Sequence, residues 1–368
     1  MRIGIVGAGA IARNAHLPAL KLTPGLEIAG IADIDEALAQ RVAKKFHIPR
    51  SYGSYRDLVR DDSIEIIDIC TPPQVRLDVI RLAAENGKHI IVEKPLALSL
   101  EEAIEIYRSV KENRVRLNVV QNYRYYASVI RAKQRVSGGY LGRIVTMQAS
   151  GLTPHPANQS RATWPYHHGG VLYDFAPHLV DLIVWLADSP PKSVCALGGD
   201  LTGGKAGFIN YAQILVEFTN GIFAMADVSW VTAILGIRFT TNIHGTGGHI
   251  LLDARNDNFV EFHGMLTPLD ELQAAFAKAM KFGWRVLNGT YFKAAASCYV
   301  QIMTDFLESV RNDTAPPVPV EQAVMTIAIL AAAERSIQDC KLVRIAELFK
   351  SKREYDQIVA TAHREGLG

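Results

Sequence analysis

Apolar runs and amphipathic stretches alternate over the first third of the chain. The apolar runs are predicted strands, and they cover residues 2–6, 27–32, 64–69, 89–92 and 116–120. Strands that alternate with helical stretches are typical of a parallel sheet covered on both faces. Two helix boundaries agree with these predicted strands. Gly87 ends the helix predicted over 74–86, and Ser99, with capping-box spacing to Glu102, begins the next one. The pattern predicts a doubly wound Rossmann-like α/β domain over residues 1–122.

Beyond about residue 140 the apolar and polar positions alternate one by one. Residues 212–218 and 223–230 form two such runs around Asn220 and Gly221, which is a strong hairpin signal. Further strand-like runs surround residues 245–248 and 260–262, and helices are predicted over 297–311 and 321–339. We therefore expect an α+β domain with a predominantly antiparallel sheet over residues 123–368. An open sheet exposes apolar area, which favours cover by a second subunit in a homodimer or homotetramer.

Composition and charge narrow the class of protein. The chain has 368 residues, 49% of them hydrophobic and 21% charged, with a net charge of +2. This balance argues against a nucleic-acid or anionic-membrane partner. The four cysteines form no CxxC pair, which favours a reducing, cytoplasmic setting. The apolar start contains the turn glycines and is predicted as a strand, and no run reaches the roughly 18–20 residues of a membrane span.

The end of the first predicted strand has the pattern of a dinucleotide-binding turn. Gly7, Gly9 and Ala12 have the spacing GxGxxA, and Ala10 and Ile11 lie inside the turn. The first glycine permits a tight turn, the second lets the backbone approach a pyrophosphate, and the alanine lets the next helix pack on the sheet. A sharp turn without a ligand is the alternative interpretation.

The second predicted strand ends in Asp33, at the distance from Gly7 expected of a ribose-binding acid. A carboxylate there would bind both ribose hydroxyls and repel a 2′-phosphate. Ile34 and Asp35 follow, and neither can neutralise a phosphate as arginine does. NAD is therefore preferred over NADP, unless Asp33 is only a solvated turn residue.

Two more predicted strands end in residues that suit a ligand crevice. Thr71 and Pro72 follow the third strand, at the edge where cofactors lie in such sheets. Glu93, Lys94 and Pro95 follow the fourth strand, where a proline that can adopt a cis bond holds the lysine toward the crevice. A surface lysine at a strand end is the alternative.

A glycine pair, Gly169 and Gly170, precedes Asp174, His178 and an apolar helix over 179–186. On a helix, residues four apart share one face, so we expect the carboxylate to orient the imidazole as a general base. A capping Asp beside a satisfied buried His is the alternative. Pro177 is tolerated if the helix begins close to Asp174.

The loop over 151–170 is rich in aromatic residues and histidines, including Trp164, Tyr166 and His167. Such a mixture suits hydroxyl-rich rings, and the loop is a candidate substrate lid or else a solvated connector. Its histidines have no convincing ligand spacing, so no metal is predicted. Tyr123 and Arg124 follow the fifth strand and border either the nicotinamide or a domain interface.

In its motifs the chain resembles the Gfo/Idh/MocA oxidoreductases, the glucose-fructose oxidoreductase and inositol dehydrogenase family. The resemblance covers nearly the whole chain and rests on Gly7, Gly9 and Ala12, on Thr71-Pro72, on Glu93-Lys94-Pro95, on Asn122-Tyr123-Arg124, and on Gly169-Gly170 with Asp174 and His178. It implies a Rossmann domain that binds NAD(P), followed by a substrate and oligomerisation domain. It also implies substrates such as sugars, inositols or nucleotide-linked sugars.

The resemblance further implies residue roles. Lys94, Asp174 and His178 match the family's catalytic trio, and Thr71, Pro72, Glu93 and Asn122 fall among the expected coenzyme contacts. Four positions depart from the family's pattern and bear on the substrate: Arg76, His168, Ala176 and Pro177.

The expected reaction is reversible oxidation of a secondary alcohol. A hydride passes to the nicotinamide, His178 takes the hydroxyl proton, and Lys94 favours the developing alkoxide. Two other functions stay open: a redox-silent NAD(P)-binding regulator on the same fold, and an NAD-dependent glycosidase that uses transient oxidation. The presence of the trio favours the dehydrogenase.

Overall fold

The computed structural model describes residues 1–153, 169–202, 207–232, 238–254, 258–263 and 293–365. Its contacts form two compact units. The first unit comprises Met1–Asn122, Ala295–Ile327 and Ala360–Gly368, and the second comprises Tyr123–Ala294 and Ala328–Val359. This division differs from the predicted one, in which everything after residue 122 belongs to the second domain. The sequence pattern around 297–311 predicts a helix, but it does not indicate to which of the two units that helix belongs.

The first unit contains a six-stranded parallel sheet of order β3-β2-β1-β4-β5-β6. Its strands are β1 (Arg2–Val6), β2 (Glu27–Ala32), β3 (Ser51–Tyr52), β4 (Ile66–Ile69), β5 (His89–Glu93) and β6 (Leu117–Val120). The five predicted strands are confirmed, and β3 adds a two-residue edge strand. β4 is buried along its whole length, because helices cover both faces of the sheet.

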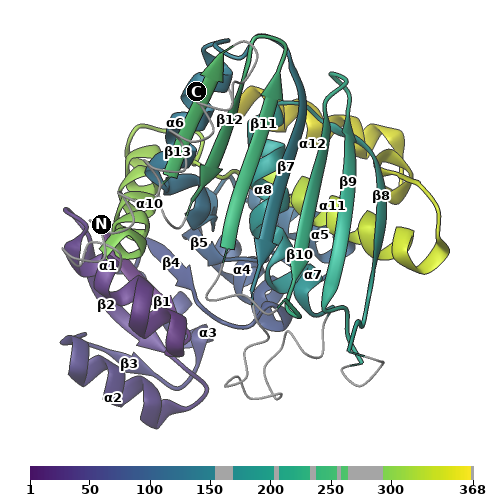
Figure 1. Cartoon of the computed structure of the whole chain (residues 1–368). Helices are drawn as coiled ribbons and strands as arrows, with labels where there is room; N and C mark the ends of the chain where they lie inside the picture. Colours follow the sequence, from purple (N-terminus) through teal and green to yellow (C-terminus); the bar gives the residue numbers. More distant parts are fainter. Residues whose placement is uncertain (154–168, 203–206, 233–237, 255–257, 264–292, 366–368) are drawn as a thin grey trace. The chain divides into compact units, whose positions relative to one another are not determined.

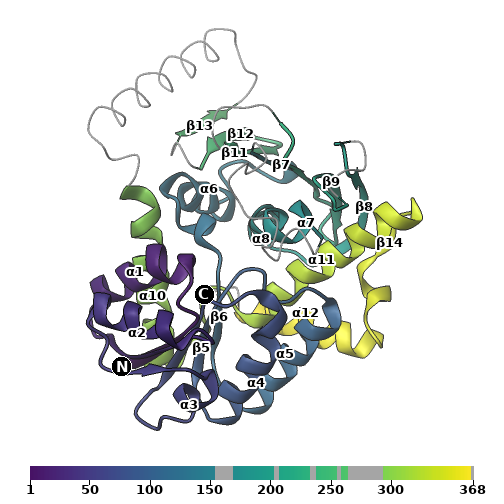
Figure 2. The ribbon, with the colours of Figure 1, turned by 90° about the horizontal axis from the view of Figure 1, so that it is seen from below.

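Helices flank this sheet as the doubly wound pattern requires, with α1 and α2 on one side and α4 and α5 on the other (Figure 2). They are α1 (Leu17–Leu22), preceded by the π-helical turn η1 (Ala12–His16), α2 (Glu36–Phe46), α3 (Tyr55–Val59), α4 (Arg76–Glu85), preceded by η2 (Pro73–Val75), and α5 (Leu100–Glu112). Gly87 adopts a positive φ of 66° after α4, as predicted. Ser99 accepts a hydrogen bond from the Glu102 amide at 3.2 Å, so its capping role is also confirmed.

The second unit contains an eight-stranded sheet of order β13-β12-β11-β7-β10-β9-β8-β14 (Figure 1). Its strands are β7 (Ile144–Leu152), β8 (Pro191–Gly199), β9 (Tyr211–Phe218), β10 (Phe223–Ser229), β11 (Arg238–Gly245), β12 (Gly248–Asp253), β13 (Asn258–His263) and β14 (Val343–Arg344). Every neighbouring pair is antiparallel except β7 and β10. The predicted β9–β10 hairpin is confirmed, with Gly221 at φ 84° in its turn.

Helices of the second unit pack against one face of its sheet, where α8 contacts β7 and β10. They include η3 (Asn122–Tyr125), α6 (Ala127–Ser137), α7 (Val171–Asp174) and α8 (Ala176–Ala187). Of the later helices, α10 (Lys293–Arg311) belongs almost wholly to the first unit and η6 (Ile345–Leu348) to the second, whereas α11 (Val320–Asp339) and α12 (Lys352–Glu365) each contribute residues to both. Among the described helices, none is both long and apolar enough to cross a membrane.

Candidate active site

The glycine turn after β1 leaves no room for a side chain at its first position. Gly7 has a φ of 101°, and a Cβ there would lie 3.0 Å from the carbonyl carbon of Cys70. Its amide donates to the Ala32 carbonyl at 2.8 Å, which fixes the turn between β1 and β2. Gly9 faces open space, since no atom lies within 4 Å of a Cβ built there. This cradle fits the close backbone approach of a pyrophosphate.

Asp33 lies beside this turn at the end of β2. Its Oδ2 accepts from the Ala8 amide at 2.7 Å, and its Oδ1 accepts from the Asp35 amide at 2.9 Å. The carboxylate is partly exposed, and the side chain of the following Ile34 is 99% exposed. These bonds orient Asp33 from both sides, and each oxygen retains a lone pair for a ribose hydroxyl.

Two buried polar atoms lie past the carboxyl ends of the neighbouring strands. Thr71 Oγ1 follows β4 and Gln121 Oε1 follows β6, and within the described residues neither has a hydrogen-bond partner. Buried polar groups are normally paired, so these two are suited to a ligand. Asn122, next to Gln121, is partly exposed. Gln121 is not among the predicted site residues, because local pattern alone does not distinguish it from an ordinary strand-end residue.

The turn that carries Lys94 is held by a buried arginine. The Lys94–Pro95 peptide bond is cis. The Arg76 Nη1 donates to the carbonyls of Glu93 and Pro95, and its Nε and Nη2 donate to the Thr71 carbonyl at 3.1 and 2.8 Å. Burial lowers the pKa of Arg76 to about 10, so it stays charged near neutral pH. Arg76, one of the residues that depart from the family's pattern, thus holds the turn of Lys94 in place. Lys94 itself is partly exposed.

A buried imidazole lies beneath the same strand ends. His16 Nδ1 lies 2.9 and 3.0 Å from the two carboxylate oxygens of Asp68, and Nε2 lies 2.9 Å from Glu93 Oε1. The Tyr299 hydroxyl donates to the same Glu93 oxygen at 3.3 Å. His16 and Asp68 are fully buried. Neither residue is among the predicted site residues, although a carboxylate inside the apolar strand β4 is a sequence signal for a buried polar partner.

By distance alone, this network could hold a cation, because ligand atoms of His16, Asp68 and Cys70 lie within 4.8 Å of one another. Their chemistry fits a metal poorly. Burial raises the pKa of the Cys70 thiol to about 12, so the sulfur keeps its proton. Both nitrogens of His16 already face carboxylates. We therefore describe the group as a hydrogen-bonded network.

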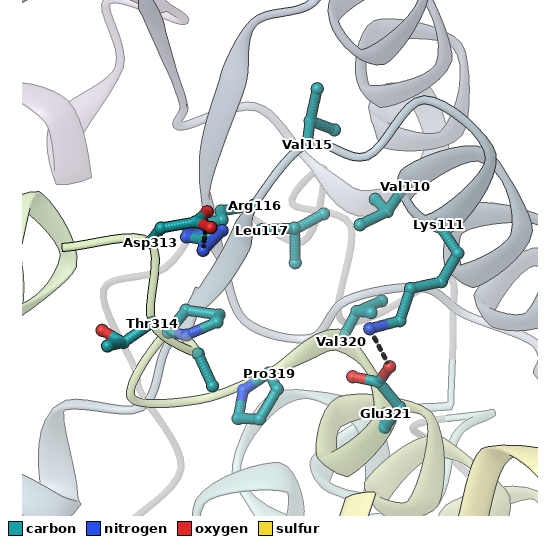
Figure 3. A pocket seen from close by; sticks show the side chains of 12 residues that line it. Val110, Lys111, Val115, Arg116, Leu117, Asp313, Thr314, Pro319, Val320 and Glu321 are labelled. Atoms are coloured by element: carbon teal, nitrogen blue, oxygen red, sulfur yellow. Dashed lines mark hydrogen bonds and ion pairs between the residues drawn. The ribbon is translucent and has the colours of Figure 1, made fainter. Parts of the chain in front are cut away.

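A cavity of about 200 Å³ lies at the opposite, amino end of β6 (Figure 3). Two ion pairs cross it: Lys111 with the buried Glu321, and Arg116 with Asp313 at 2.6 Å. The strand direction places this cavity away from the carboxyl ends where Thr71 and Lys94 lie. We assign it no part in the candidate site.

In the second unit the glycine pair forces a close backbone approach. Gly170 has a φ of 59°, and a Cβ there would collide with the Ile209 carbonyl. That carbonyl accepts from the Val171 amide at 2.8 Å. Only glycine fits this position without displacing the backbone of Ile209, which lies just before β9.

The helix expected to carry both Asp174 and His178 is divided in two. Asp174 ends α7, and His178 lies in the first turn of α8, which begins at Ala176. The expected single helix is therefore interrupted at Phe175, where φ is −105° and ψ is −37°. Pro177 lies in the first turn of α8, where a missing amide hydrogen is tolerated.

Aromatic rings surround His178, whose residue is only 8% exposed. Its ring centroid lies 4.6 Å from that of Tyr123 and 6.0 Å from that of Phe175. Tyr123 in turn stacks on Phe239 at 3.9 Å. Tyr123 thus packs against the candidate base. Asp174, four positions before His178, is partly exposed.

Arg124 forms a buried, bidentate ion pair with Asp181. Its Nε and Nη2 donate to the two carboxylate oxygens at 2.7 and 2.6 Å, and both side chains are under 5% exposed. The guanidinium also lies 5.2 Å from the Trp185 ring centroid. This geometry ties η3 to α8. The remaining predicted substrate residues, Trp164, Tyr166 and His167, lie outside the described residues.

Two family models match this chain. One, described as "Oxidoreductase family, NAD-binding Rossmann fold", covers residues 1–121, and the other, "GFO/IDH/MocA C-terminal domain", covers residues 129–251. Together they account for more than half of the sequence. The chain belongs to the Gfo/Idh/MocA oxidoreductase family. It is an NAD-dependent dehydrogenase, as its resemblance implies.

Individual relatives agree with this placement. Uncharacterized oxidoreductase YrbE of Bacillus subtilis (strain 168) is 31% identical over 261 residues, which is 70% of this chain and 75% of that protein. Myo-inositol 2-dehydrogenase of Thermotoga maritima is 23% identical over 353 residues, 95% and 99% of the two chains. Among solved structures, levoglucosan dehydrogenase in complex with NADH and levoglucosan has a TM-score of 0.80 at 20% identity, with 94% and 98% coverage. The last similarity concerns the fold.

Proposed function

We propose that the protein oxidises, reversibly, a secondary alcohol of a sugar, an inositol or a nucleotide-linked sugar. The observation that carries the proposal is the arrangement at the carboxyl ends of β4 and β5. There Arg76 and Glu93 fix the turn of Lys94 beside the orphaned hydroxyl of Thr71. Relatives named myo-inositol 2-dehydrogenase and levoglucosan dehydrogenase act, by their names, on polyhydroxylated rings, which supports this substrate class.

The first unit would bind NAD through its turn and strand ends. In this proposal, the exposed backbone at Gly9, Ala10 and Ile11 faces the pyrophosphate, Gly7 and Ala12 shape the turn around it, and Asp33 binds the adenosine ribose. Ile34 offers an apolar surface to the adenine. Thr71, Pro72, Glu93, Gln121 and Asn122 border the nicotinamide end. NAD supplies the hydride acceptor, and the protein positions the reactants.

Three side chains would handle the substrate oxygen and its proton. Lys94 donates a hydrogen bond to the reacting oxygen and stabilises the negative charge that develops there. His178 accepts the hydroxyl proton, and Asp174 orients the imidazole or binds a neighbouring hydroxyl. The same groups serve ketone reduction, since the proton then moves from His178 to the product.

Aromatic and polar residues of the second unit would select the substrate. Tyr123 packs against His178 and is the described residue best suited to border the substrate ring. Trp164, Tyr166 and His167 remain candidates for stacking and hydrogen bonds. Arg124 is engaged by Asp181, so we propose that it positions η3 and acts on the substrate only through Tyr123.

We also propose a homo-oligomer, in which a second copy covers the free face of the eight-stranded sheet. Three exposed apolar residues on neighbouring strands share that face by register: Leu197, Leu215 and Phe223, with exposures of 69, 45 and 50%. Exposed apolar side chains grouped on one face in this way favour a protein partner.

All four cysteines are free thiols, which supports a reducing, cytoplasmic setting.

The test of the proposal is the formation of NADH when NAD and a panel of inositols, sugars and nucleotide-linked sugars are added to the protein. We expect turnover with at least one cyclic polyol. A protein that binds NADH but oxidises no member of the panel would contradict the proposed substrate class. The regulator and glycosidase alternatives gain no support from relatives named dehydrogenases.

A further inference from the structure

The hydrogen bonds of His16 with Asp68 and Glu93 connect two parts of the first unit: the glycine turn proposed to bind the coenzyme and the turn that carries Lys94. His16 ends η1, the helical turn that continues directly from the glycine turn. Glu93 is the last residue of β5, and its Oε2 accepts from the Lys94 amide at 3.1 Å. One imidazole therefore connects the proposed pyrophosphate cradle with the lysine turn.

With the carboxylates of Asp68 and Glu93 ionised, the geometry requires that both nitrogens of His16 carry a proton. An ionised carboxylate only accepts hydrogen bonds, and His16 faces a carboxylate at each nitrogen within 3.0 Å. The charges also balance, since the cations His16 and Arg76 match the anions Asp68 and Glu93. A buried charge is tolerated when it is paired and hydrogen-bonded in this way.

The pKa shifts agree with this reading. Burial, the largest single influence, lowers the pKa of His16, but the interactions with Asp68 and Cys70 together outweigh it and raise the pKa well above its ordinary value of 6.5. Burial raises the pKa of Glu93, and the hydrogen bond and charge of His16, aided by Lys94 and Arg76, reverse the shift and lower it. Cys70 and Tyr299 are the other titratable groups that face the ring.

We propose that His16 is a positioning residue: a buried imidazolium that couples the coenzyme turn to the turn of Lys94 through Glu93. Its removal would leave Asp68 and Glu93 with one buried cation, Arg76, in place of two. Glu93 would then lose the partner that orients it, and the Lys94 amide would lose a fixed acceptor. The part of this inference that concerns Lys94 rests on the proposed function, whereas the effect on coenzyme binding does not.

The first measurement is the protonation state of His16 in the full chain without substrate. Nitrogen-15 NMR of histidine-labelled protein, with His16→Gln used to assign the signal, should show a ring that is protonated at both nitrogens at pH values well above 6.5. A singly protonated ring under those conditions would overturn the proposal, because a neutral imidazole cannot donate to both carboxylates.

The second measurement is the dissociation constant of NADH. We expect His16→Gln and Glu93→Gln each to weaken binding by roughly 10- to 100-fold, the scale seen when supporting hydrogen bonds around a site are lost. The double variant H16Q/E93Q restores neutrality and should bind more tightly than H16Q. If H16Q fails to fold, Tyr299→Phe removes only one bond to Glu93 and should still weaken NADH binding measurably.

Glu321→Gln is the matched control. It also removes the charge of a buried carboxylate paired with a cation in the first unit, but at the amino end of β6 (Figure 3). We expect E321Q to destabilise the fold without changing the NADH dissociation constant. Equal losses of NADH affinity in E321Q and H16Q, or no loss in H16Q and Y299F, would overturn the coupling. A protein that binds NADH as expected but lacks turnover would instead count against the proposed function alone.

Discussion

Nε2 of His16 lies 2.9 Å from Oε1 of Glu93, although the two residues are 77 positions apart and both are buried. Parallel strands make this contact possible, because β1, β4 and β5 are neighbours and all end at the same edge. The turn that follows β1 therefore reaches the residue that precedes Lys94. A charged contact at this place makes the stability of the protein depend on pH.

The free energy of unfolding should fall as the pH rises above 6.5. A histidine whose pKa is raised in the folded state contributes its full stability below its unfolded pKa, here 6.5, and loses it as the pH approaches the folded value. Glu93, whose pKa is lowered, contributes above 4.5 and loses its contribution as the pH falls below that value. Urea unfolding at a series of pH values measures the acid limb due to Glu93 and the alkaline limb due to His16. In each limb the free energy of unfolding should change by up to about 1.4 kcal/mol per pH unit for one proton.

His16→Gln should remove the alkaline limb of this profile. His89→Gln is the control, because burial and Arg116 lower the pKa of His89, so its effect is confined to pH values below 6.5. An alkaline limb that persists unchanged in H16Q would contradict the charged network.

Asp33→Asn should reduce the preference for NADH over NADPH. Asp33 is oriented by the Ala8 and Asp35 amides, and a carboxylate beside a 2′-phosphate costs several kcal/mol through like-charge repulsion. We expect the ratio of the two dissociation constants to change by about tenfold or more. Asp35→Asn removes the same charge two positions away while keeping a helix-capping side chain, and it should leave the ratio nearly unchanged. Equal changes in both variants would attribute the preference to overall charge.

Leu215→Lys should dissociate the proposed oligomer. Leu215 lies on β9, between Met225 and Cys195 on the neighbouring strands. A buried ammonium without a partner is strongly unfavourable at an interface. Light scattering should give a multiple of 40.5 kDa for the wild type and 40.5 kDa for L215K. Leu342→Lys is a control outside the sheet, and a monomeric wild type would refute the proposal.

The elements of the fold follow closely from local pattern. Strands β1 and β2 were predicted at their observed ends, since an apolar run bounded by turn residues specifies a buried parallel strand. Strand β3 has two residues, too few for any periodicity. The parallel pairing of β7 with β10 joins segments about 75 residues apart, and hydrophobic alternation does not encode such partners.

The candidate site was less predictable than the fold. Three site residues directly follow predicted strands, where their residue types seldom serve structure alone: Gly7, Asp33 and Lys94. Their spacing is therefore enough to identify them from the sequence. His16 and Asp68 acquire their meaning only when η1 packs over β4, a contact between positions 52 residues apart. The division between α7 and α8 was also unforeseen, although Pro177 indicated that a helix begins close to it.

The central claim is that Lys94 and His178 perform alcohol oxidation in a protein that binds NAD independently of them. The direct measurement is kcat/KM for the best polyol, alongside the NADH dissociation constant, for wild type, Lys94→Ala and His178→Ala. We predict that each variant loses roughly 100-fold or more in kcat/KM, the scale of a positioned acid–base group, while its NADH affinity stays within a few-fold of wild type. Full activity in either variant would contradict the account.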